Sequence, residues 1–233
     1  MRAVVLVPTY NERANISELV EKVRQVAPGL HILIIDDNSP DGTGELAEEL
    51  ARQYPDEIFV LHRKSKEGLG KAYVDAFGEI LKRDYEYILQ MDADLSHDPA
   101  HLPGFFEKIK DHDLVVGSRY LQGISVVNWD LKRLIMSKLA TNYVRFITRM
   151  PFSDTTSGFM CWRREALESI GFAKAFSSGY VFLVEMKYKA YRQGFRLAEV
   201  PIIFVERKSG NSKLDWRVIW EALWGVLRLR VKY

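Results

Sequence analysis

Residues 87–94 read Tyr87-Ile88-Leu89-Gln90-Met91-Asp92-Ala93-Asp94, a short apolar run that ends in two acids on alternate positions. The run predicts a buried strand, and side chains two apart in a strand lie on the same face. Both acids can therefore point into the crevice at the carboxyl ends of the strands, where open α/β sheets bind ligands. A divalent cation such as Mg²⁺ or Mn²⁺ would relieve their mutual repulsion. The alternative is a turn with acidic residues before a helix that begins near Ser96, and the pair alone does not decide.

Strand-like and helical patterns alternate on both sides of this segment. Apolar runs predict strands over 3–7, 31–35, 58–61, 87–91 and 113–117, and amphipathic patterns predict helices over 16–26, 44–53, 71–83 and 102–110. Such alternation is typical of an α/β protein with a Rossmann-like, mostly parallel central sheet and helices on both faces.

The second half of the chain is less regular. It predicts one or two helices over 129–150, helices over 164–169 and 179–193, a late strand over 197–205 that Pro201 interrupts, and a closing helix over 214–231. Since no repeat or linker is visible, we expect one α/β domain over residues 1–213 and a C-terminal amphipathic helix over 214–233.

The composition bounds the class of protein. The chain has 233 residues and a formal net charge of +2, which is too small to indicate nucleic-acid binding through bulk charge. Its single cysteine, Cys161, cannot form an internal disulfide, which favours a reducing compartment. No secretory signal and no uncharged run of roughly 18–20 residues is visible. We therefore expect a cytoplasmic protein, soluble or peripheral on the cytoplasmic face of a membrane, that does not bind nucleic acid.

Polar residues also follow the first two predicted strands. Pro8-Thr9-Tyr10-Asn11-Glu12 ends the first and Asp36-Asp37-Asn38-Ser39 the second, at the same sheet edge as Asp92 and Asp94. No glycine-rich dinucleotide turn follows the first strand; Gly68-Leu69-Gly70 comes after the third and lacks a third glycine. A nucleotide here would be held by acids and a cation rather than by a glycine cradle.

These motifs are similar to those of a known family. Residues 8–12, residues 36–43 and Asp92-Ala93-Asp94 resemble segments of the family 2 inverting glycosyltransferases, which have the GT-A (nucleotide-diphosphosugar transferase) fold. Further matching segments are Gly117-Ser118-Arg119-Tyr120, Ser157-Gly158-Phe159, residues 179–186, Phe204-Val205-Glu206-Arg207 and Gly210-Asn211-Ser212-Lys213. Together they resemble the branch of the family that transfers mannose to dolichyl phosphate, over a stretch from Val4 to about Leu214.

The resemblance implies how the donor is bound. Pro8, Tyr10, Glu12, Ile35 and Asp37 would line the pocket for base and ribose, and Asp92, Ala93, Asp94 and Ser96 would hold the nucleotide sugar and its cation. Glu12 and Asp37 suit hydrogen bonds to guanine or ribose hydroxyls, although each could instead be an acid at a helix start. The metal ligands would be Asp92, Asp94 and an oxygen of Ser96, a weaker donor than the glutamine of some relatives.

The acceptor phosphate is already ionised near neutral pH, so it requires cations more than a strong base. With Asp94 as the catalytic metal ligand, Arg119, Arg207 and Lys213 would complete the catalytic set and also contact the nucleotide sugar. The alternative for each cation is a solvated surface position. Arg207 and Lys213 flank a glycine-containing segment typical of a lid. Glu185 would either orient the sugar or form a structural ion pair, and the sequence does not decide.

Two segments could meet a membrane, where a polyprenyl acceptor must be bound. Residues 128–150 carry one acid, Asp130, and the basic residues Lys132, Arg133, Lys138, Arg145 and Arg149. The last helix places Arg217, Glu221, Arg228 and Lys232 on one stripe and Trp216, Trp220 and Trp224 on another. Basic helices with tryptophan suit the lipid interface, but packing against the sheet explains the last helix equally well. A small membrane subunit could also supply the anchor.

The expected activity is inverting transfer of mannose from GDP-mannose to dolichyl or another polyprenyl phosphate, with Mg²⁺ or Mn²⁺ as cofactor. Direct attack would turn an α-linked donor into a β-linked product. The alternatives are a glucosyl counterpart that uses UDP-glucose, a family 2 transferase that acts on a soluble glycan with Glu185 as base, and a non-catalytic nucleotide- or lipid-binding regulator. None of these residues distinguishes guanine from uracil on chemical grounds.

Overall fold

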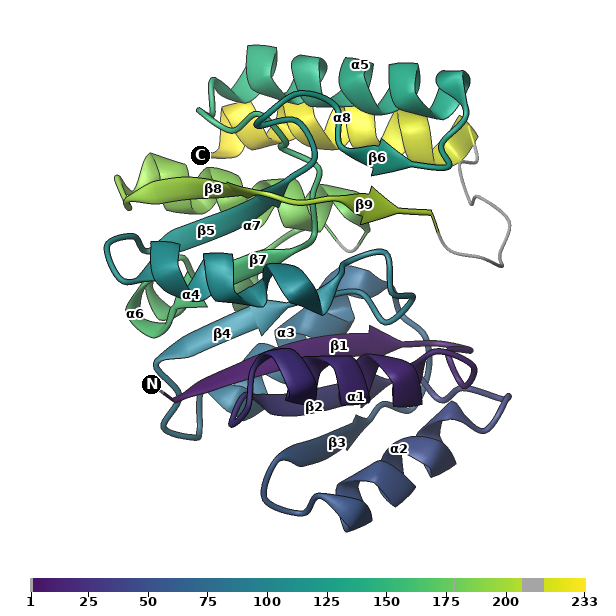
Figure 1. Ribbon diagram of the computed structural model, residues 1–233. Coiled ribbons are helices and arrows are strands. Elements are labelled where there is room, and N and C mark those ends of the chain that lie inside the picture. The colour runs from purple at the N-terminus through teal and green to yellow at the C-terminus, as the bar shows by residue number, and fades with distance from the viewer. Residues whose placement is uncertain (1, 178, 207–215) are drawn as a thin grey trace.

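A computed structural model describes residues 2–177, 179–206 and 216–233, except for the side chains of 216–219, 221 and 222. The chain forms a seven-stranded sheet in the order β3-β2-β1-β4-β7-β5-β8 (Figure 1). The strands are β1 (Ala3–Thr9), β2 (His31–Asp36), β3 (Ile58–His62), β4 (Tyr87–Gln90), β5 (Leu114–Ser118), β7 (Met160–Arg163) and β8 (Leu197–Pro201). Neighbouring strands are parallel except around β7, which runs antiparallel to β4 and β5.

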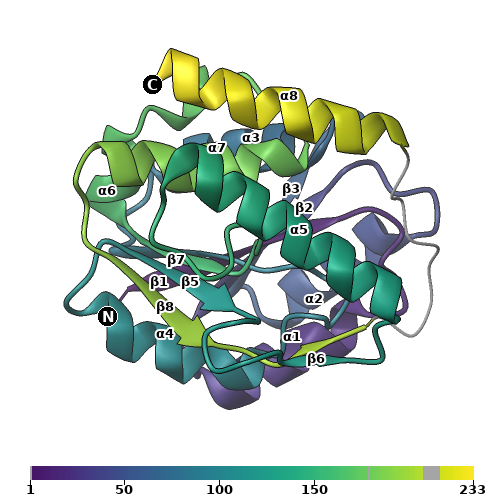
Figure 2. The same cartoon turned by 90° about the horizontal axis from the view of Figure 1, so that it is seen from above.

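Helices cover both faces of the sheet (Figures 1 and 2). Side chains of α1 (Ile16–Val26), α2 (Thr43–Gln53) and α4 (Leu102–Ile109) join the hydrophobic cluster on one face. Those of α3 (Leu69–Ile80), α6 (Arg164–Ser169) and α7 (Tyr180–Arg192) join the cluster on the other face. The two clusters make this a three-layer protein whose strands are buried on both sides.

An outer pair of helices adds to the α7 side. α8 (Trp216–Lys232) packs against α7, and α5 (Leu131–Thr148) lies beside α8 (Figure 2). The hydroxyl of Tyr143 on α5 donates a hydrogen bond to the carbonyl of Leu223 on α8 at 2.8 Å. The remaining elements are the pair β6 (Val126–Val127) and β9 (Phe204–Val205) and the 3-10 helices Pro99–His101 and Phe172–Lys174.

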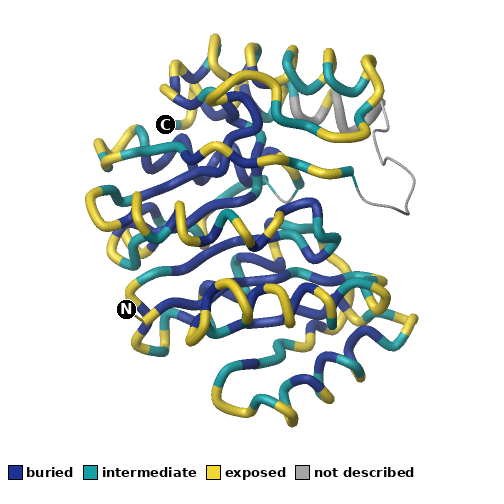
Figure 3. The backbone as a smooth tube through the Cα atoms, in the orientation of Figure 1, coloured by how far each residue is buried: buried dark blue, intermediate teal, exposed yellow. Residues whose placement is uncertain are grey.

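The alternation of side chains along β1 explains the two helical layers. Val4 and Leu6 belong to the cluster beneath α3 and α7, whereas Val5 and Val7 belong to the cluster beneath α1 and α4. These side chains are fully buried, and Figure 3 shows the strands as a buried central layer. A strand that is apolar on both faces requires cover on both faces.

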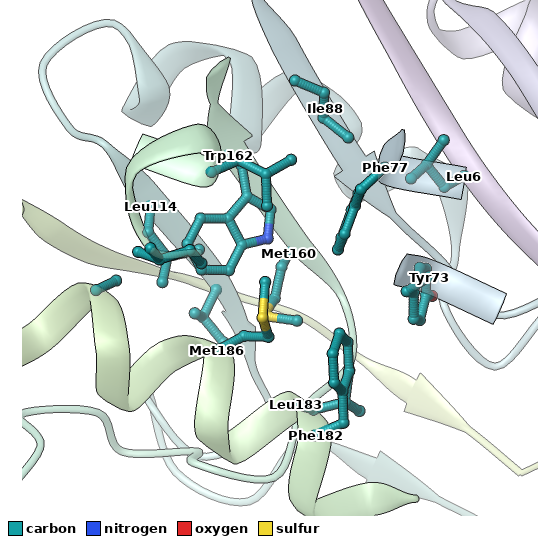
Figure 4. Packing of buried hydrophobic residues seen from close by; sticks show 14 of the residues in the cluster. Leu6, Tyr73, Phe77, Ile88, Leu114, Met160, Trp162, Phe182, Leu183 and Met186 are labelled. Atoms are coloured by element: carbon teal, nitrogen blue, oxygen red, sulfur yellow. The ribbon is translucent and has the colours of Figure 1, made fainter. Parts of the chain in front are cut away.

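Large core side chains gather where α7 meets the central strands (Figure 4). Trp162 of β7 donates a hydrogen bond from Nε1 to Oε1 of Gln90 on β4 at 2.7 Å. Phe182 of α7 stacks on Tyr73 of α3, and a Cβ at Gly70 would lie only 2.8 Å from the Phe182 ring. Glycine at position 70 therefore lets the N-terminal end of α7 approach α3 closely.

The predicted fold class is confirmed, with local corrections. The helices predicted over 16–26 and 164–169 have the observed bounds, and one helix, α5, occupies the region for which one or two were predicted. The interruption at Pro201 predicted for the late strand over 197–205 is confirmed: Pro201, which has no amide hydrogen to donate, is the last residue of β8. The residues after it do not continue the same strand, because β9 pairs with β6 instead. β7 was not predicted, because a run as short as Met160–Arg163 carries little periodicity.

Across the ranges that the structure describes, no helix is both long and apolar enough to cross a bilayer. The division into residues 1–213 and 214–233 stays a prediction.

Candidate active site

A cavity of about 420 Å³ opens at the carboxyl ends of the parallel strands. Its walls comprise Pro8, Glu12, Leu69, Asp92, Ala93, Asp94, Ser96, His97, Arg119, Trp129, Arg133, Thr156, Ser157, Gly158, Gly179, Tyr180, Leu183 and Phe204. The antiparallel direction of β7 explains part of this set. Because β7 begins where β4 and β5 end, the residues before it, Thr156 to Gly158, reach the same edge as Asp92 and Arg119.

Asp92 and Asp94 both face this cavity, as the spacing predicted. The Asp92 side chain is 41% exposed. Oδ1 of Asp94 accepts hydrogen bonds from the amide of Ser96 at 3.1 Å and from its hydroxyl at 2.5 Å, across Leu95 with a positive φ of 61°. The turn thus holds one Asp94 oxygen in place and leaves its carboxylate at the cavity wall.

Ser96 was predicted to offer an oxygen to the metal. Ser96 is buried, with 2% of the residue exposed, and its hydroxyl donates to Asp94. This geometry favours a role in orienting Asp94. The alternative interpretation of the segment was a turn before a helix start, and a short helix does begin here. Asp98 caps the 3-10 helix Pro99–His101 by accepting a hydrogen bond from the amide of Ala100 at 2.9 Å.

His97 was not singled out from the sequence. Its Nδ1 accepts a hydrogen bond from the amide of Asp92 at 3.0 Å. The ring stacks on Phe159 at 4.9 Å and meets Phe204 edge-on at 5.8 Å. His97 therefore fixes the backbone from which Asp92 projects. In the sequence, the feature that could have pointed to His97 is its position five residues after Asp92.

Arg119, the predicted acceptor-side cation, lies in a buried clamp. Its Nε donates to Oδ2 of Asp154 at 2.6 Å, and its Nη2 donates to Oδ1 of Asp154 at 2.8 Å and to the hydroxyl of Thr156 at 2.7 Å. Burial opposes the charge on Arg119, but Asp154 outweighs burial and raises the pKa of the guanidinium. Within the described residues, the hydrogen bonds of the Arg119 side chain use Nε and Nη2 and none uses Nη1. Nη1 can therefore donate a hydrogen bond to an anion in the cavity.

A second buried cation supports the wall on which Thr156 and Ser157 lie. Lys187 of α7 is fully buried and donates from Nζ to the carbonyl of Ser157 at 2.6 Å. Burial lowers the pKa of Lys187 to about 7, and Asp154 and Glu199 partly oppose that shift. Glu199 in turn accepts from the amide of Asp154 at 3.0 Å. This network, which sequence reasoning missed, joins β8, α7 and the clamp.

The predicted base and ribose residues do not all reach the cavity. Pro8 and Glu12 line it, whereas Tyr10, Ile35 and Asp37 do not. Oε2 of Glu12 accepts from the side chain of Asn15 at 2.7 Å, just before α1, which matches the alternative of an acid at a helix start. Ile35 is fully buried in the hydrophobic cluster beneath α3.

Asp37 and Tyr10 have protein partners of their own. Asp37 is buried against Arg63, whose Nε also donates to Asp75 at 2.9 Å. Burial raises the pKa of Asp37, and the hydrogen bond from Arg63 opposes the shift. Nζ of Lys66 lies 3.7 Å from the centre of the Tyr10 ring. A nucleotide role for either residue stays a prediction.

Glu185 is fully buried outside this cavity. It accepts hydrogen bonds from the amides of Phe176 and Ser177, from the Ser177 hydroxyl at 2.6 Å and from the Tyr233 hydroxyl at 2.9 Å. Its oxygens therefore serve the segment before α7 and the end of α8, which favours the structural alternative. Arg207 and Lys213 lie outside the described residues, so their roles stay predictions.

Two residues predicted for the membrane lie elsewhere. Arg133 lines the cavity, where it pairs with Glu206 and lies 4.5 Å from the Trp129 ring. Lys138 lies 3.8 Å from the Tyr120 ring. The side chains of Arg133 and Lys138 therefore contact other parts of the protein, which the sequence of α5 alone does not show.

The oxygen atoms at the cavity wall determine whether a divalent cation could bind there. In the described part of the chain, no three His, Cys, Asp or Glu side chains come together as a closed metal site. Asp92 and Asp94 nevertheless offer hard oxygen ligands at the cavity wall, which suits Mg²⁺ or Mn²⁺ that takes its other ligands from phosphates and water. The residues present therefore fit such an ion.

Comparison with known proteins identifies the family. Residues 4–171 match the sequence profile described as Glycosyl transferase family 2. The chain belongs to this family. Polyprenol monophosphomannose synthase of Mycolicibacterium smegmatis is 44% identical over 231 residues, covering 97% of this chain and 87% of the relative. Undecaprenyl-phosphate mannosyltransferase of Micrococcus luteus is 39% identical over 228 residues, covering 98% and 93%.

Solved structures of other glycosyltransferases share the fold. Glucosyl-3-phosphoglycerate synthase of Mycobacterium tuberculosis, solved with Mn²⁺, UDP and phosphoglyceric acid, has a TM-score of 0.72 at 17% identity and covers 98% of this chain and 78% of its own. Mannosyltransferase PcManGT of Pyrobaculum calidifontis, solved with GDP-Man and Mn²⁺, has a TM-score of 0.67 at 18% identity and covers 100% and 64%. The likeness confirms the predicted GT-A fold of this family 2 transferase.

Proposed function

We propose that this family 2 transferase moves mannose from GDP-mannose to a polyprenyl phosphate such as dolichyl phosphate, with inversion. The observation that carries the proposal is one cavity with two carboxylates on one wall and the clamped Arg119 on another. The names of the relatives at 44% and 39% identity support the mannosyl donor group and the polyprenyl phosphate acceptor.

The chemistry divides between the two walls. An oxygen of the acceptor phosphate attacks the anomeric carbon of mannose, and the bond from that carbon to the diphosphate oxygen breaks, which releases GDP. Arg119, held by Asp154 and Thr156, is placed to donate from Nη1 to the acceptor phosphate. Asp92 and Asp94 would hold Mg²⁺ or Mn²⁺, and the bound cation would neutralise charge on the leaving diphosphate. No strong base is required, since the phosphate is ionised already.

A transfer assay tests the activity. The protein is incubated with polyprenyl phosphate, Mg²⁺ or Mn²⁺ and radiolabelled GDP-mannose, UDP-glucose or UDP-galactose in parallel, and label in the lipid phase is counted. We expect a lipid product with GDP-mannose. A product with UDP-glucose alone would assign the glucosyl activity, and donor binding without turnover would assign a regulator.

The acceptor class has its own test. A transferase for a soluble glycan would require Glu185 as base, so Glu185→Gln would abolish turnover more completely than Arg207→Ala. The buried hydrogen bonds of Glu185 support the opposite ranking. Because Glu185→Gln perturbs packing, its activity is compared per folded protein, with near-UV circular dichroism as the check.

We also propose that the outer side of α5 and α8, here called the α5/α8 face, lies on the cytoplasmic surface of a membrane. Leu131, Ile135, Leu139, Phe146 and Trp224 are exposed on it, with Phe146 82% and Trp224 66% exposed. The basic residues Lys132, Arg145 and Arg149 are exposed on α5 as well. Apolar side chains edged by cations suit an anionic lipid interface.

Flotation with anionic vesicles tests the α5/α8 face. The pair Phe146→Ser and Trp224→Ser should reduce vesicle binding, while Val26→Ser on α1, which is also exposed but lies on the other side of the sheet, should not. Equal binding by both proteins would contradict a lipid contact here. Binding restored only by a co-expressed small membrane protein would favour a separate anchoring subunit.

A further inference from the structure

A second cavity, of about 470 Å³, lies at the far end of α7. Tyr180 at the start of α7 lines the first cavity, and Arg192 at the end of the helix lines the second. Because an α-helix rises about 1.5 Å per residue, the two sites are roughly 18 Å apart. The C-terminal ends of α7 and α8 lie close together here, beside the C-terminus in Figure 1.

Basic side chains from three elements converge on this cavity. Lys189 and Arg192 come from α7, Lys232 from α8 and Lys174 from the 3-10 helix Phe172–Lys174. Among the described residues, no Asp or Glu lines the cavity. Cations at a helix end are common because they interact with the helix dipole, but the dipole does not explain why Lys174 approaches from a separate element.

The groups around Lys189 show that the cations of this cluster repel one another. Its Nζ donates to the carbonyl of Gly171 at 2.9 Å and lies 3.9 Å from Oε1 of Glu185, the nearest acid. Burial lowers the pKa of Lys189, Glu185 partly opposes the shift, and Lys232 and Lys174 lower it further. One carboxylate thus faces several cations, and an added anion would relieve the remaining repulsion.

We propose that this second cavity binds a phosphate-bearing anion. Lysines act as point charges toward phosphate, and the planar guanidinium of Arg192 can contact it through two nitrogens. Nη1 of Arg192 donates to the Tyr188 hydroxyl at 3.2 Å, which orients the group. Ile170 and the Tyr233 ring supply apolar walls, so the cavity also suits a phosphate attached to a larger body.

The phosphate has two possible sources, a soluble anion or a lipid headgroup. Lys232 follows Val231 at the end of α8, and Val231 is 88% exposed. Because Val231 lies seven residues after Trp224 on α8, it extends the same stripe of the α5/α8 face, and a headgroup could reach the cavity from a bilayer there. The chemistry that recognises the ligand is the same in both cases.

A charge-removal triple variant tests the site. Lys174→Gln, Arg192→Gln and Lys232→Gln are combined in one protein, and Lys22→Gln, Arg52→Gln and Lys108→Gln are combined in a control. All six residues are exposed, and the control residues lie on α1, α2 and α4. Isothermal titration with inorganic phosphate at constant ionic strength forms one arm. Sedimentation with phosphatidylglycerol vesicles, compared with phosphatidylcholine vesicles, forms the other.

We expect the triple variant to lose roughly tenfold or more in affinity in at least one arm, since each lost contact is a charge-assisted hydrogen bond, and the control to match the parent protein. Loss with phosphate alone assigns a soluble anion, and loss with vesicles alone assigns a headgroup. Equal binding by triple variant and control in both arms overturns the site. Neither arm measures sugar transfer, so the result is independent of the proposed activity.

Discussion

Carboxylates occur in this protein in two contrasting settings. Asp92 and Asp94 lie at the wall of the first cavity, on the loop after β4. Asp154 and Glu185 are fully buried, and each accepts several hydrogen bonds, including one or more from a distant residue, Arg119 for Asp154 and Tyr233 for Glu185. The buried acids hold the fold together, whereas the acids at the cavity wall keep oxygen atoms within reach of a ligand.

The difference shows how one sheet edge supports both stability and chemistry. The ion pair with Asp154 fixes the orientation of the Arg119 guanidinium, which still lines the cavity. Removal of one partner of such a buried pair lowers the stability of the fold strongly, because the other charge then remains buried without a partner. Substitutions in each of the two settings should therefore differ in their effects on stability and on activity.

Removal of the buried charge should have the largest effect on stability. Asp154→Asn leaves Arg119 buried without its partner, and we expect the free energy of unfolding to fall by about 3–5 kcal/mol, as measured by urea denaturation. Glu168→Gln, which breaks the exposed pair with Arg164, should cost only ~0.3–0.5 kcal/mol. Similar losses for both variants would contradict the distinction between buried and exposed pairs.

Asp94→Asn should instead affect activity and leave stability nearly unchanged. Loss of a charge that acts on the leaving diphosphate should lower kcat by roughly 10²–10³-fold in the lipid-transfer assay. Asp98→Asn provides the matched control, since Asp98 is close in sequence and caps a short helix outside the cavity. Full metal-dependent turnover by Asp94→Asn would remove the ion from the mechanism.

Lys187 predicts a dependence of stability on pH. Burial lowers its pKa to about 7 from the ordinary value of 10.5. Between these values the unfolded chain binds a proton that the folded protein does not, so the free energy of unfolding should rise with pH by up to ~1.4 kcal/mol per unit. Below pH 7 both states are protonated and this contribution no longer changes.

The comparison is made with Lys187→Met. Urea unfolding at several pH values between 7.5 and 9.5 should give a smaller rise for the variant than for the parent protein. Because the other titrating groups are shared, the difference between the two slopes isolates Lys187. Parallel slopes would show that Lys187 stays charged in the folded protein.

Apart from the control variants, the smallest effect is expected at the end of α8. Tyr233→Phe removes one hydrogen bond to Glu185, which keeps its other donors, so we expect a loss of ~1 kcal/mol in a thermal or urea unfolding experiment. Tyr191→Phe is the control, because no hydrogen bond of its hydroxyl occurs within the described residues. A loss confined to Tyr233→Phe would show that α8 stabilises the segment before α7.

Asp92 and Asp94 face the cavity as their position at a strand end predicted, whereas Tyr10 and Asp37, which also follow strands, do not line it. The acids after β4 follow from the period of a strand, and the α/β class follows from the alternation of apolar runs and amphipathic helices. The partners of the site were not predictable in this way. Asp154 and Thr156 meet Arg119 across 35 and 37 positions because β7 reverses direction inside a parallel sheet.

The roles of single charges show the same limit. Arg133 and Lys138 belong to the basic segment predicted to meet a membrane, yet they turn toward Glu206 and Tyr120. Asp37 fits a nucleotide motif and is paired with Arg63. No local pattern carries this information, because each pairing depends on the approach of another element.

The fold class, the family and the position of Asp92 and Asp94 at the carboxyl edge of the sheet follow from the amino-acid sequence alone. These depend on short periods and on the chemistry of neighbouring residues. The three-dimensional packing determines which charged groups face the cavity and which are neutralised inside the protein. That outcome depends on burial and on partners contributed by distant segments, which a linear sequence does not specify.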